Sequence, residues 1–150
     1  VLFRSVVTAT GLALVPLGNV KLAVDGKPVT PKETFIYKGM MYSDVPNLAS
    51  VFGYTNASWT LKADLVCEYV CRLLNLMDRK GYRRCMPHNS DPSLQAEPWV
   101  SFSSGYIQRA LAHQPKQGSR RPWKLYQNYA LDLLSLRYGR LRDDAMTFAR

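Results

Sequence analysis

The sequence predicts an α/β fold, or an α+β fold if the chain is an isolated fragment. A β-branched run from Val6 to Ala9 ends in a Thr10-Gly11 turn, which is typical of the end of a strand. A second apolar run, Leu48 to Phe52, leads through a turn of small residues into the longest segment with helical periodicity. Between these runs, Asp25-Gly26 supplies the two positive-φ positions that a tight β-hairpin turn requires.

The first half of the chain is expected to consist mainly of short extended segments. Asp25-Gly26 would join one strand at Val20 to Val24 with another at Lys27 to Thr30. The segment from Phe35 to Tyr42 has a mixed composition and is expected to be extended. The run from Leu48 to Phe52 is expected to form a short buried strand.

The clearest element is a helix over Ser58 to Lys80. Either Ser58 or Asn56 can cap its start, and a glycine follows two basic residues at its end. Glu68 and Arg72 are spaced for an i,i+4 ion pair on the solvent side. The expected apolar stripe consists of Trp59, Ala63, Val66, Val70, Leu73 and Met77.

The second half begins with a loop at Met86 to Pro98, which prolines and small polar residues mark. A short helix is expected from Ser103 or Ser104 through residue 113. The segment from Trp123 to Tyr138 has amphipathic periodicity and predicts a second long helix. Its aromatic residues, Trp123, Tyr126, Tyr129 and Tyr138, are interpreted as packing residues rather than as a base-stacking platform.

The bulk composition indicates one globular core. Hydrophobic residues make up 47% of the 150 residues. No apolar run approaches the roughly 18 residues of a membrane span, and the first residues lack the pattern of a signal peptide. Three cysteines are too few for a disulfide framework and fit a reducing compartment. A cytoplasmic location is therefore expected.

The net charge of +9 is the one unusual bulk property. A nucleic-acid partner would suit it, but a basic piece separated from acidic partner segments would carry the same charge. The basic residues are spread over several segments and do not form one long run. This pattern favours a chain without a nucleic-acid partner. A basic nucleic-acid-binding domain and a stand-alone interaction module remain the two alternatives.

The thiols and histidines suggest two kinds of site that we do not favour. Cys67 and Cys71 lie one helical turn apart, and Cys85-x-x-His88 would complete four zinc ligands. Because the first pair is expected in mid-helix beside the apolar stripe, the thiols are interpreted as small buried residues, and no metal is expected. His88 and His113 are expected on the surface, without a nucleophile motif. No catalytic residue is therefore assigned within this chain.

The segment from Gly53 to Asp64 is the strongest candidate for a binding site. It places a turn of small residues before a helix, whose first backbone N–H groups lack partners within the helix. Such groups can meet an anionic or electron-rich ligand. An ordinary strand–turn–helix packing unit has the same pattern, so the residues alone leave both interpretations open.

Several segments resemble flavin-dependent monooxygenases, whose chain returns from the NADPH domain to the FAD domain at an Ala-Thr-Gly turn. The resemblance extends from about Val6 to the end of the chain. It is greatest to the class B, Baeyer–Villiger-type branch that includes the ethionamide-activating monooxygenase. The similar segments are Val7 to Gly11, Tyr37 to Met41, Pro46-Asn47, Gly53 to Lys62, Pro115 to Arg120 with Trp123, and Gln127 to Tyr129.

The resemblance implies the C-terminal part of a Rossmann-like FAD domain, with a short sheet and hairpin region, one long helix and a helical C-terminal extension. Residues 1–85 would belong to the FAD-binding domain, truncated at its N-terminus, and residues 86–150 would form a loop and the extension. Residues 1–5 match poorly. Both dinucleotide fingerprints and the family's catalytic arginine would precede residue 1, so the chain alone is expected to be inactive.

The activity implied by the resemblance uses NADPH to reduce FAD. Through a flavin peroxide, such an enzyme inserts one atom of O₂ into a ketone or into an N or S centre of a small organic molecule. Thr10 and Gly11 would lie near the phosphate–ribose part of FAD. The other implied cofactor-binding residues are Gly53, Thr55, Asn56, Ala57, Ser58, Trp59, Thr60 and Leu61, with Asn56 to Leu61 near the flavin ring. Peripheral membrane association and the oligomeric state stay open.

Overall fold

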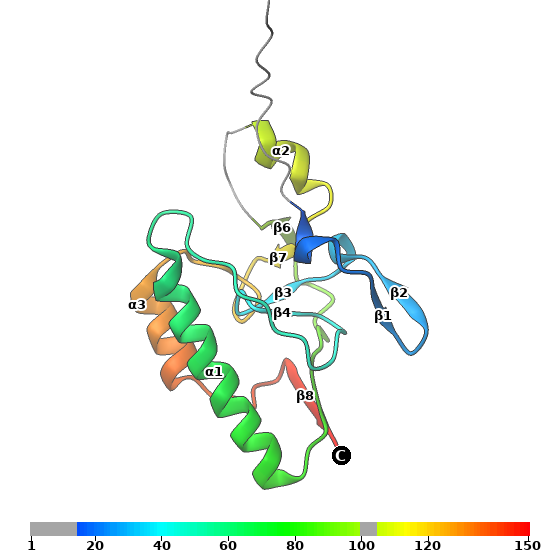
Figure 1. The fold of residues 1–150 in the computed structure, drawn as a ribbon, viewed down its shortest axis with the longest axis vertical. Helices are drawn as coiled ribbons and strands as arrows, with labels where there is room; N and C mark the ends of the chain where they lie inside the picture. The colour runs from blue at the N-terminus through cyan, green and yellow to red at the C-terminus, as the bar shows by residue number, and fades with distance from the viewer. Residues whose placement is uncertain (1–14, 100–104) are drawn as a thin grey trace, which may run out of the picture.

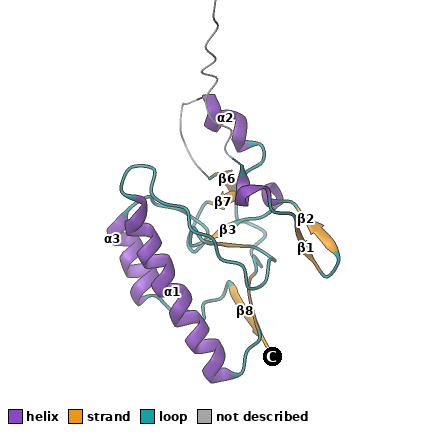
Figure 2. Ribbon diagram, in the orientation of Figure 1, coloured by secondary structure: helices purple, strands orange, loops and turns teal. Residues whose placement is uncertain are grey.

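The computed structural model describes residues 15–99 and 105–150, which form helices and small antiparallel sheets (Figure 1). The expected mixed α/β class is therefore confirmed. The expected strand at Val6 to Ala9 lies outside the described residues. Figure 2 shows that loops connect most of the short strands and make up much of the chain between the helices.

The described strands pair two by two, and each pair is antiparallel. The pairs are β1 (Leu22–Val24) with β2 (Lys27–Val29), β3 (Ile36–Tyr37) with β4 (Met41–Tyr42), β5 (Arg84–Pro87) with β8 (Met146–Ala149), and β6 (Ala96–Pro98) with β7 (Lys116–Gly118). The helices are α1 (Trp59–Lys80), α2 (Gly105–Leu111) and α3 (Tyr129–Asp132), which continues as the π-helical η3 (Leu133–Tyr138). Short 3₁₀ turns, η1 (Pro16–Asn19) and η2 (Pro31–Glu33), flank the first hairpin.

The hairpin at Asp25-Gly26 is confirmed. Asp25 has a φ of 50° and Gly26 a φ of 77°, the left-handed conformations that a two-residue hairpin turn needs. A second hairpin lies within the segment that was expected only to be extended. There, Lys38 (φ 49°) and Gly39 (φ 75°) turn the chain between β3 and β4.

Helix α1 agrees with the expected helix within one residue, and Gly81 ends it in the left-handed conformation with a φ of 66°. Its buried face differs from the expected stripe. Trp59 is 55% exposed, because the first turn of α1 extends beyond the core. Ser58 does not cap the helix, since its hydroxyl is 2.7 Å from the Thr60 hydroxyl instead. The buried residues of α1 are Lys62, Leu65, Val66, Tyr69, Leu73 and Met77.

The expected buried strand at Leu48 to Phe52 is wrong. Only Ala49 forms an isolated bridge, with Met41, and Val51 is 46% exposed. The Ser50 N–H donates to the Met40 carbonyl at 2.7 Å, which ties the segment to the β3–β4 hairpin at one point. The segment from Leu48 to Phe52 is therefore irregular, because no neighbouring strand pairs with it along its length.

The helix expected over Trp123 to Tyr138 is also wrong in its first half. Trp123 lies in the core, with its ring at an edge to those of Phe35 and Tyr37. Gln127 has a positive φ of 48°, which a helix does not accommodate. Asn128 then caps α3 by accepting a hydrogen bond from the Leu131 N–H.

The three tyrosines after Trp123 do not pack as expected. Tyr126, Tyr129 and Tyr138 are 45%, 40% and 69% exposed. The region from residue 86 onward is also not helical throughout, since it contains β6, β7 and β8 besides its helices.

The core lies between α1, the β3–β4 hairpin and the last third of the chain. α1 packs beside α3 and η3, and β8 returns to pair with β5 near the C-terminal end of α1 (Figure 1). Strand β5 crosses the expected division at residues 85 and 86, so residues on both sides of that division share one core. The core cluster comprises Tyr37, Met40, Met41, Leu65, Val66, Tyr69, Leu73, Met77, Cys85, Leu94, Trp123, Leu136, Ala145 and Met146.

The expected i,i+4 pair between Glu68 and Arg72 is wrong. Glu68 instead accepts two hydrogen bonds from Arg137, which lower the pKa of the Glu68 carboxyl. Arg72 turns toward the end of η3 and donates to three backbone carbonyls there. Arg137 can bind the Glu68 carboxylate with two parallel hydrogen bonds. The end of η3 offers Arg72 carbonyl oxygens that have no partner within the helix. Both residues therefore bind distant partners instead of each other.

Among the residues that the structure describes, no helix combines the length and the apolar character needed to cross a bilayer.

Candidate functional site

The turn before α1 is fastened to the segment that precedes α3. The Thr55 backbone N–H donates to Oε1 of Gln127 at 3.1 Å, and the Thr55 hydroxyl is 3.3 Å from the same oxygen. The Asn56 side-chain amide donates to the Gln127 backbone carbonyl at 3.1 Å. Two parts of the chain that lie about 70 positions apart are thus joined, and the start of α1 has a fixed position.

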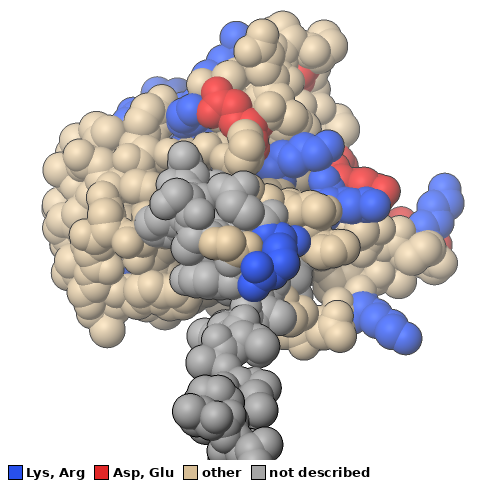
Figure 3. All heavy atoms as spheres, turned by 90° about the horizontal axis from the view of Figure 1, so that it is seen from above, with Lys and Arg blue, Asp and Glu red and all other residues tan. Residues whose placement is uncertain are grey.

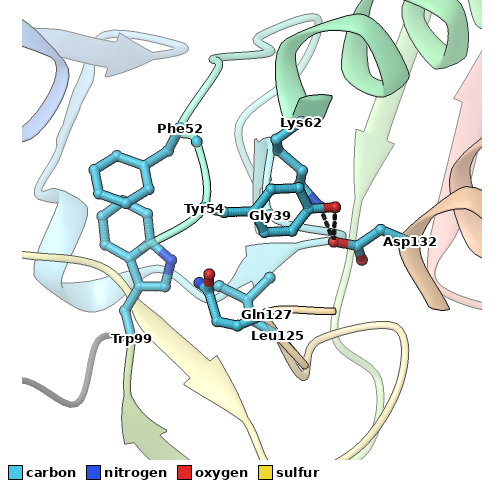
Figure 4. A pocket seen from close by; sticks show the side chains of 9 residues that line it. Gly39, Phe52, Tyr54, Lys62, Trp99, Leu125, Gln127 and Asp132 are labelled. Carbon is cyan, nitrogen blue, oxygen red and sulfur yellow. Dashed lines mark hydrogen bonds and ion pairs between the residues drawn. The ribbon is translucent and has the colours of Figure 1, made fainter. Parts of the chain in front are cut away.

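A polar cluster of Tyr54, Lys62 and Asp132 connects this turn and α1 to α3 (Figure 4). The Lys62 ammonium lies 2.8 Å from Oδ2 of Asp132, and the Tyr54 hydroxyl donates to the same oxygen at 2.7 Å. Burial, followed by the hydrogen bond to the Asp132 carboxylate, raises the pKa of Tyr54 well above its usual value. The tyrosine is therefore a neutral donor that links the turn to α3.

Aromatic rings cover the other side of the turn. The Phe52 ring lies 4.4 Å from the Trp99 ring and 4.9 Å from the Trp59 ring, measured between centroids. Gly53 allows this arrangement, since a Cβ there would lie 2.2 Å from Cγ of Trp59. The space between Phe52, Trp99 and the polar cluster is about 10 Å³, which is at most enough for one water molecule.

The outer surface of the same turn is open. Asn56, Ala57, Ser58, Trp59, Thr60 and Leu61 are all exposed. No side chain caps the first turn of α1, and no acidic residue lies in it. The first backbone N–H groups of the helix therefore lack a side-chain cap, at an end that carries about half a positive charge.

The interior space beneath the turn is far too small for a ligand of the size of a flavin ring. On the outer surface of the turn, the side chains of Ala57 and Ser58 are small, uncharged and exposed. Thr10 and Gly11, expected near the phosphate–ribose part of the cofactor, lie outside the described residues.

The residues that hold the turn were not among those expected to form the site: Tyr54, Lys62, Gln127 and Asp132. One signal was available for Lys62. It lies three positions before the buried Leu65 and seven before the buried Tyr69, so it falls on the buried face of α1. A lysine in an apolar stripe indicates a buried ion pair, although its partner in α3 has no sequence signature.

The thiols and histidines are arranged differently from a metal or catalytic site. Cys67 and Cys71 are exposed, which corrects their interpretation as buried residues, and Cys85 is buried. Within residues 15–99 and 105–150, no three His, Cys, Asp or Glu side chains come together as metal ligands. His88 and His113 are exposed as expected, and His88 lies 2.6 Å from Asp44.

Basic side chains are spread over the surface. On the face seen in Figure 3, Lys and Arg side chains stand in separate places, several of them beside Asp or Glu. No continuous basic band is visible on that face. Among the described residues, five Lys or Arg side chains and His88 form ion pairs with Asp or Glu. The pairs are Lys38–Asp143, Lys62–Asp132, His88–Asp44, Arg120–Asp91, Lys124–Glu97 and Arg137–Glu68.

The chain is similar to proteins named as FAD-containing or FAD-binding monooxygenases. It is 47% identical over 145 residues, 97% of its length, to the FAD-containing monooxygenase EthA of Mycolicibacterium smegmatis. It is 44% identical over 144 residues to the probable FAD-binding monooxygenase AlmA of Acinetobacter baylyi. It is also 40% identical over 145 residues to the putative FAD-containing monooxygenase MymA of Mycobacterium tuberculosis.

These relatives confirm the resemblance to flavin-dependent monooxygenases of the ethionamide-activating branch. The aligned part covers 30% of the first relative and 29% of the other two. The chain thus spans about three tenths of the length of the curated relatives that it matches. No family model and no solved structure matches the chain.

Proposed function

We propose that this chain is the C-terminal part of an FAD- and NADPH-dependent monooxygenase and supplies one wall of its flavin site. The similarity to FAD-containing monooxygenases over 97% of the chain supports this class. The observation that carries the site assignment is the exposed, uncapped start of α1 at Asn56 to Leu61. In this proposal, residues 1–85 complete the FAD-binding domain and residues 86–150 extend it.

The chain's own residues would act by binding and positioning. The backbone N–H groups at the start of α1 would stabilise negative charge at the edge of the flavin ring, and Ala57 and Ser58 would allow the ring to approach the backbone. Tyr54, Lys62 and Asp132 would hold the turn in place from the interior. Thr10 and Gly11 would contact the phosphate–ribose part of FAD. When bound, FAD supplies the redox and oxygen chemistry.

The remaining details of the activity are also proposals. The substrate would be a small organic molecule with a ketone, nitrogen or sulfur centre, with O₂ as the co-substrate and NADPH as the reductant. The free cysteines fit a cytoplasmic enzyme. The catalytic groups and the Gly-rich nucleotide-binding turns would come from the part of the relatives that this chain does not cover.

Two substitutions at the start of α1 test the site in the full-length enzyme. Ser58→Asp and Asn56→Asp would each place a carboxylate beside the electron-rich edge of the ring. Because Asn56→Asp also removes the hydrogen bond to the Gln127 carbonyl, Ser58→Asp is the cleaner of the two. Like-charge repulsion should lower the reduction potential of the flavin and weaken FAD retention, by about 1–2 kcal/mol. Potentiometric titration and the flavin content after gel filtration measure the two effects.

Asn75→Asp is the matched control, because it makes the same chemical change at an exposed position of α1 about four turns from its start. The control should retain the wild-type potential and FAD content. If both variants at the start of the helix also retain them, the turn does not face the ring. In that case the proposed site is wrong, even if the protein is a monooxygenase.

A further inference from the structure

The solvent face of α1 presents two thiols that have no part in the core or in the proposed flavin site. Cys67 and Cys71 are exposed and lie four residues apart in the middle of a 22-residue helix. The third thiol, Cys85, lies in the core, where burial raises its pKa. The chain therefore carries an accessible pair of thiols and a separate, shielded one.

The helix decides what the pair can bind. Residues four apart on a helix have Cβ atoms about 5–6 Å apart, whereas a disulfide needs Cβ atoms about 3.5–4.5 Å apart. Regular α1 geometry therefore opposes a direct disulfide between them. One soft atom bonded to both sulfurs, with bonds of about 2.3 Å, can span up to roughly 4.6 Å between them. Rotation about χ1 of the two cysteines changes the distance between their sulfurs and leaves the helix backbone in place.

The surroundings favour a soft ligand that takes only two sulfurs. Structural zinc requires four ligands, and the described residues offer no third His, Cys, Asp or Glu side chain grouped with this pair. Glu68, which lies between the two cysteines in the sequence, is held by Arg137. Thiolates select soft ions such as Cu(I) over hard oxygen-preferring ions.

We propose that Cys67 and Cys71 form a two-thiolate site for soft, thiophilic ligands, namely monovalent copper and trivalent arsenicals. With an arylarsine oxide, both thiols lose their protons, two S–As bonds form, and the oxide oxygen leaves as water. No electron is transferred in this step. A ligand that links the two positions fastens one turn of α1 to the next, so binding stabilises the helix.

The experiment uses phenylarsine oxide and the reduced 150-residue chain. Mass spectrometry of the intact protein should show one phenylarsenic group per chain, bound with loss of two protons. Excess glutathione, a monothiol, should not remove it, whereas 2,3-dimercaptopropanol should. The midpoint of thermal unfolding should rise, since the ligand binds the folded helix preferentially.

Three variants locate the site, with far-ultraviolet circular dichroism confirming that each retains its helix. Cys67→Ser and Cys71→Ser should each lose the glutathione-resistant adduct, and Cys85→Ala should retain it. An adduct that survives either of the first two substitutions, or is absent from the wild type, overturns the proposal. An adduct that forms without raising the unfolding midpoint also overturns it, because the two thiols would then be bridged only in the unfolded chain.

A second arm distinguishes copper from harder ions. Cu(I) added without oxygen should be retained at one ion per chain against a competing chelator, and Cys67→Ser should lose it. Zn(II) at the same concentration should not be retained. Failure to retain copper, or retention of zinc as firmly as copper, overturns the assignment to soft metal ions. None of these outcomes depends on the proposed flavin site.

Discussion

At Gly53, the absence of a side chain lets the Trp59 ring lie directly against the backbone. A Cβ at this position would be 2.2 Å from Cγ and 2.6 Å from Cβ of Trp59. The second of these atoms is close to the main chain of α1 and cannot move freely. Gly53 therefore sets how closely the turn approaches the first turn of the helix, which is the surface that we propose for the flavin ring.

Gly53→Ala should destabilise the protein by about 1–3 kcal/mol through overpacking. Urea unfolding measures this loss. In a Trp59→Ala background the same substitution should cost much less, because the clashing ring is gone, and the double-mutant cycle isolates that contact. An equal cost in both backgrounds would show that the contact with Trp59 is not the reason for glycine at this position.

At the scale of elements, Arg72 joins α1 to the end of η3. Its guanidinium donates to the Leu136 carbonyl at 2.6 Å and to the Gly139 carbonyl at 2.9 Å, and also to the carbonyl of Arg137. The last carbonyls of a helix have no partner within it. One planar side chain with several donors therefore pairs with two of the last carbonyls of η3 and with that of the next residue, a role that the sequence pattern of α1 did not reveal.

Arg72→Met should lower the free energy of unfolding by about 2 kcal/mol, because it removes charge-assisted hydrogen bonds and leaves carbonyls unpaired. Glu68→Gln is the control on the same helix. It weakens a half-exposed ion pair, so its effect in urea unfolding should be clearly smaller. Equal losses for the two variants would contradict the helix-end role of Arg72.

For the molecule as a whole, a buried tyrosine network connects the hairpin, α1 and the C-terminal segment. The Tyr37 hydroxyl donates to Oδ2 of Asp143 at 2.7 Å and lies 3.3 Å from the Tyr69 hydroxyl. The Lys38 ammonium lies 3.0 Å from the same Asp143 oxygen. Burial raises the pKa of Tyr69 to about 12, and burial together with its two partners raises that of Tyr37 further.

This network predicts a loss of stability in alkali. The unfolded chain releases the Tyr69 proton near its ordinary pKa of about 10, whereas the folded chain holds it until about 12. The stabilisation is therefore complete below pH 10 and is lost as the pH rises through 12. For Tyr69 the loss should be about 2–3 kcal/mol, since each unit corresponds to about 1.4 kcal/mol.

Urea unfolding at several pH values between 9 and 12 measures this loss. The free energy of unfolding of Tyr69→Phe should fall less steeply with rising pH than that of the wild type. Tyr138 is exposed, so Tyr138→Phe should follow the wild type. Burial lowers the pKa of Lys38, so its contribution to the free energy of unfolding changes with pH in the opposite direction. Lys38 is present in all three proteins, and the comparison between them is therefore unaffected. Parallel curves for the wild type and Tyr69→Phe would contradict the network's contribution.

The 150-residue chain alone is expected neither to hold FAD tightly nor to consume oxygen. A Gly-rich βαβ turn, which cradles the pyrophosphate, is absent from its sequence, and the space beneath the start of α1 is about 10 Å³. Flavin fluorescence and NADPH absorbance, followed on mixing with the purified chain, measure binding and turnover. Sub-micromolar flavin binding or NADPH-dependent oxygen uptake would require a complete site in these residues.

Local chemistry in the sequence was enough to determine several elements. Asp25-Gly26 fixed a hairpin because its positive-φ turn needs no distant partner. The helix over Ser58 to Lys80 was predictable from periodicity and from the glycine at its end. The resemblance to flavin-dependent monooxygenases was likewise carried by the sequence itself and was confirmed by the relatives.

Tertiary structure alone decided which partners these elements have. Leu48 to Phe52 looks like a strand, but a strand exists only where a neighbour pairs with it, and here one bridge forms. Trp123 lies outside any helix because its ring packs in the core, edge-on to that of Tyr37. Lys62 is buried because Asp132, 70 residues away, compensates its charge. Periodicity describes one segment at a time, whereas burial and ion pairing depend on what the rest of the chain places opposite it.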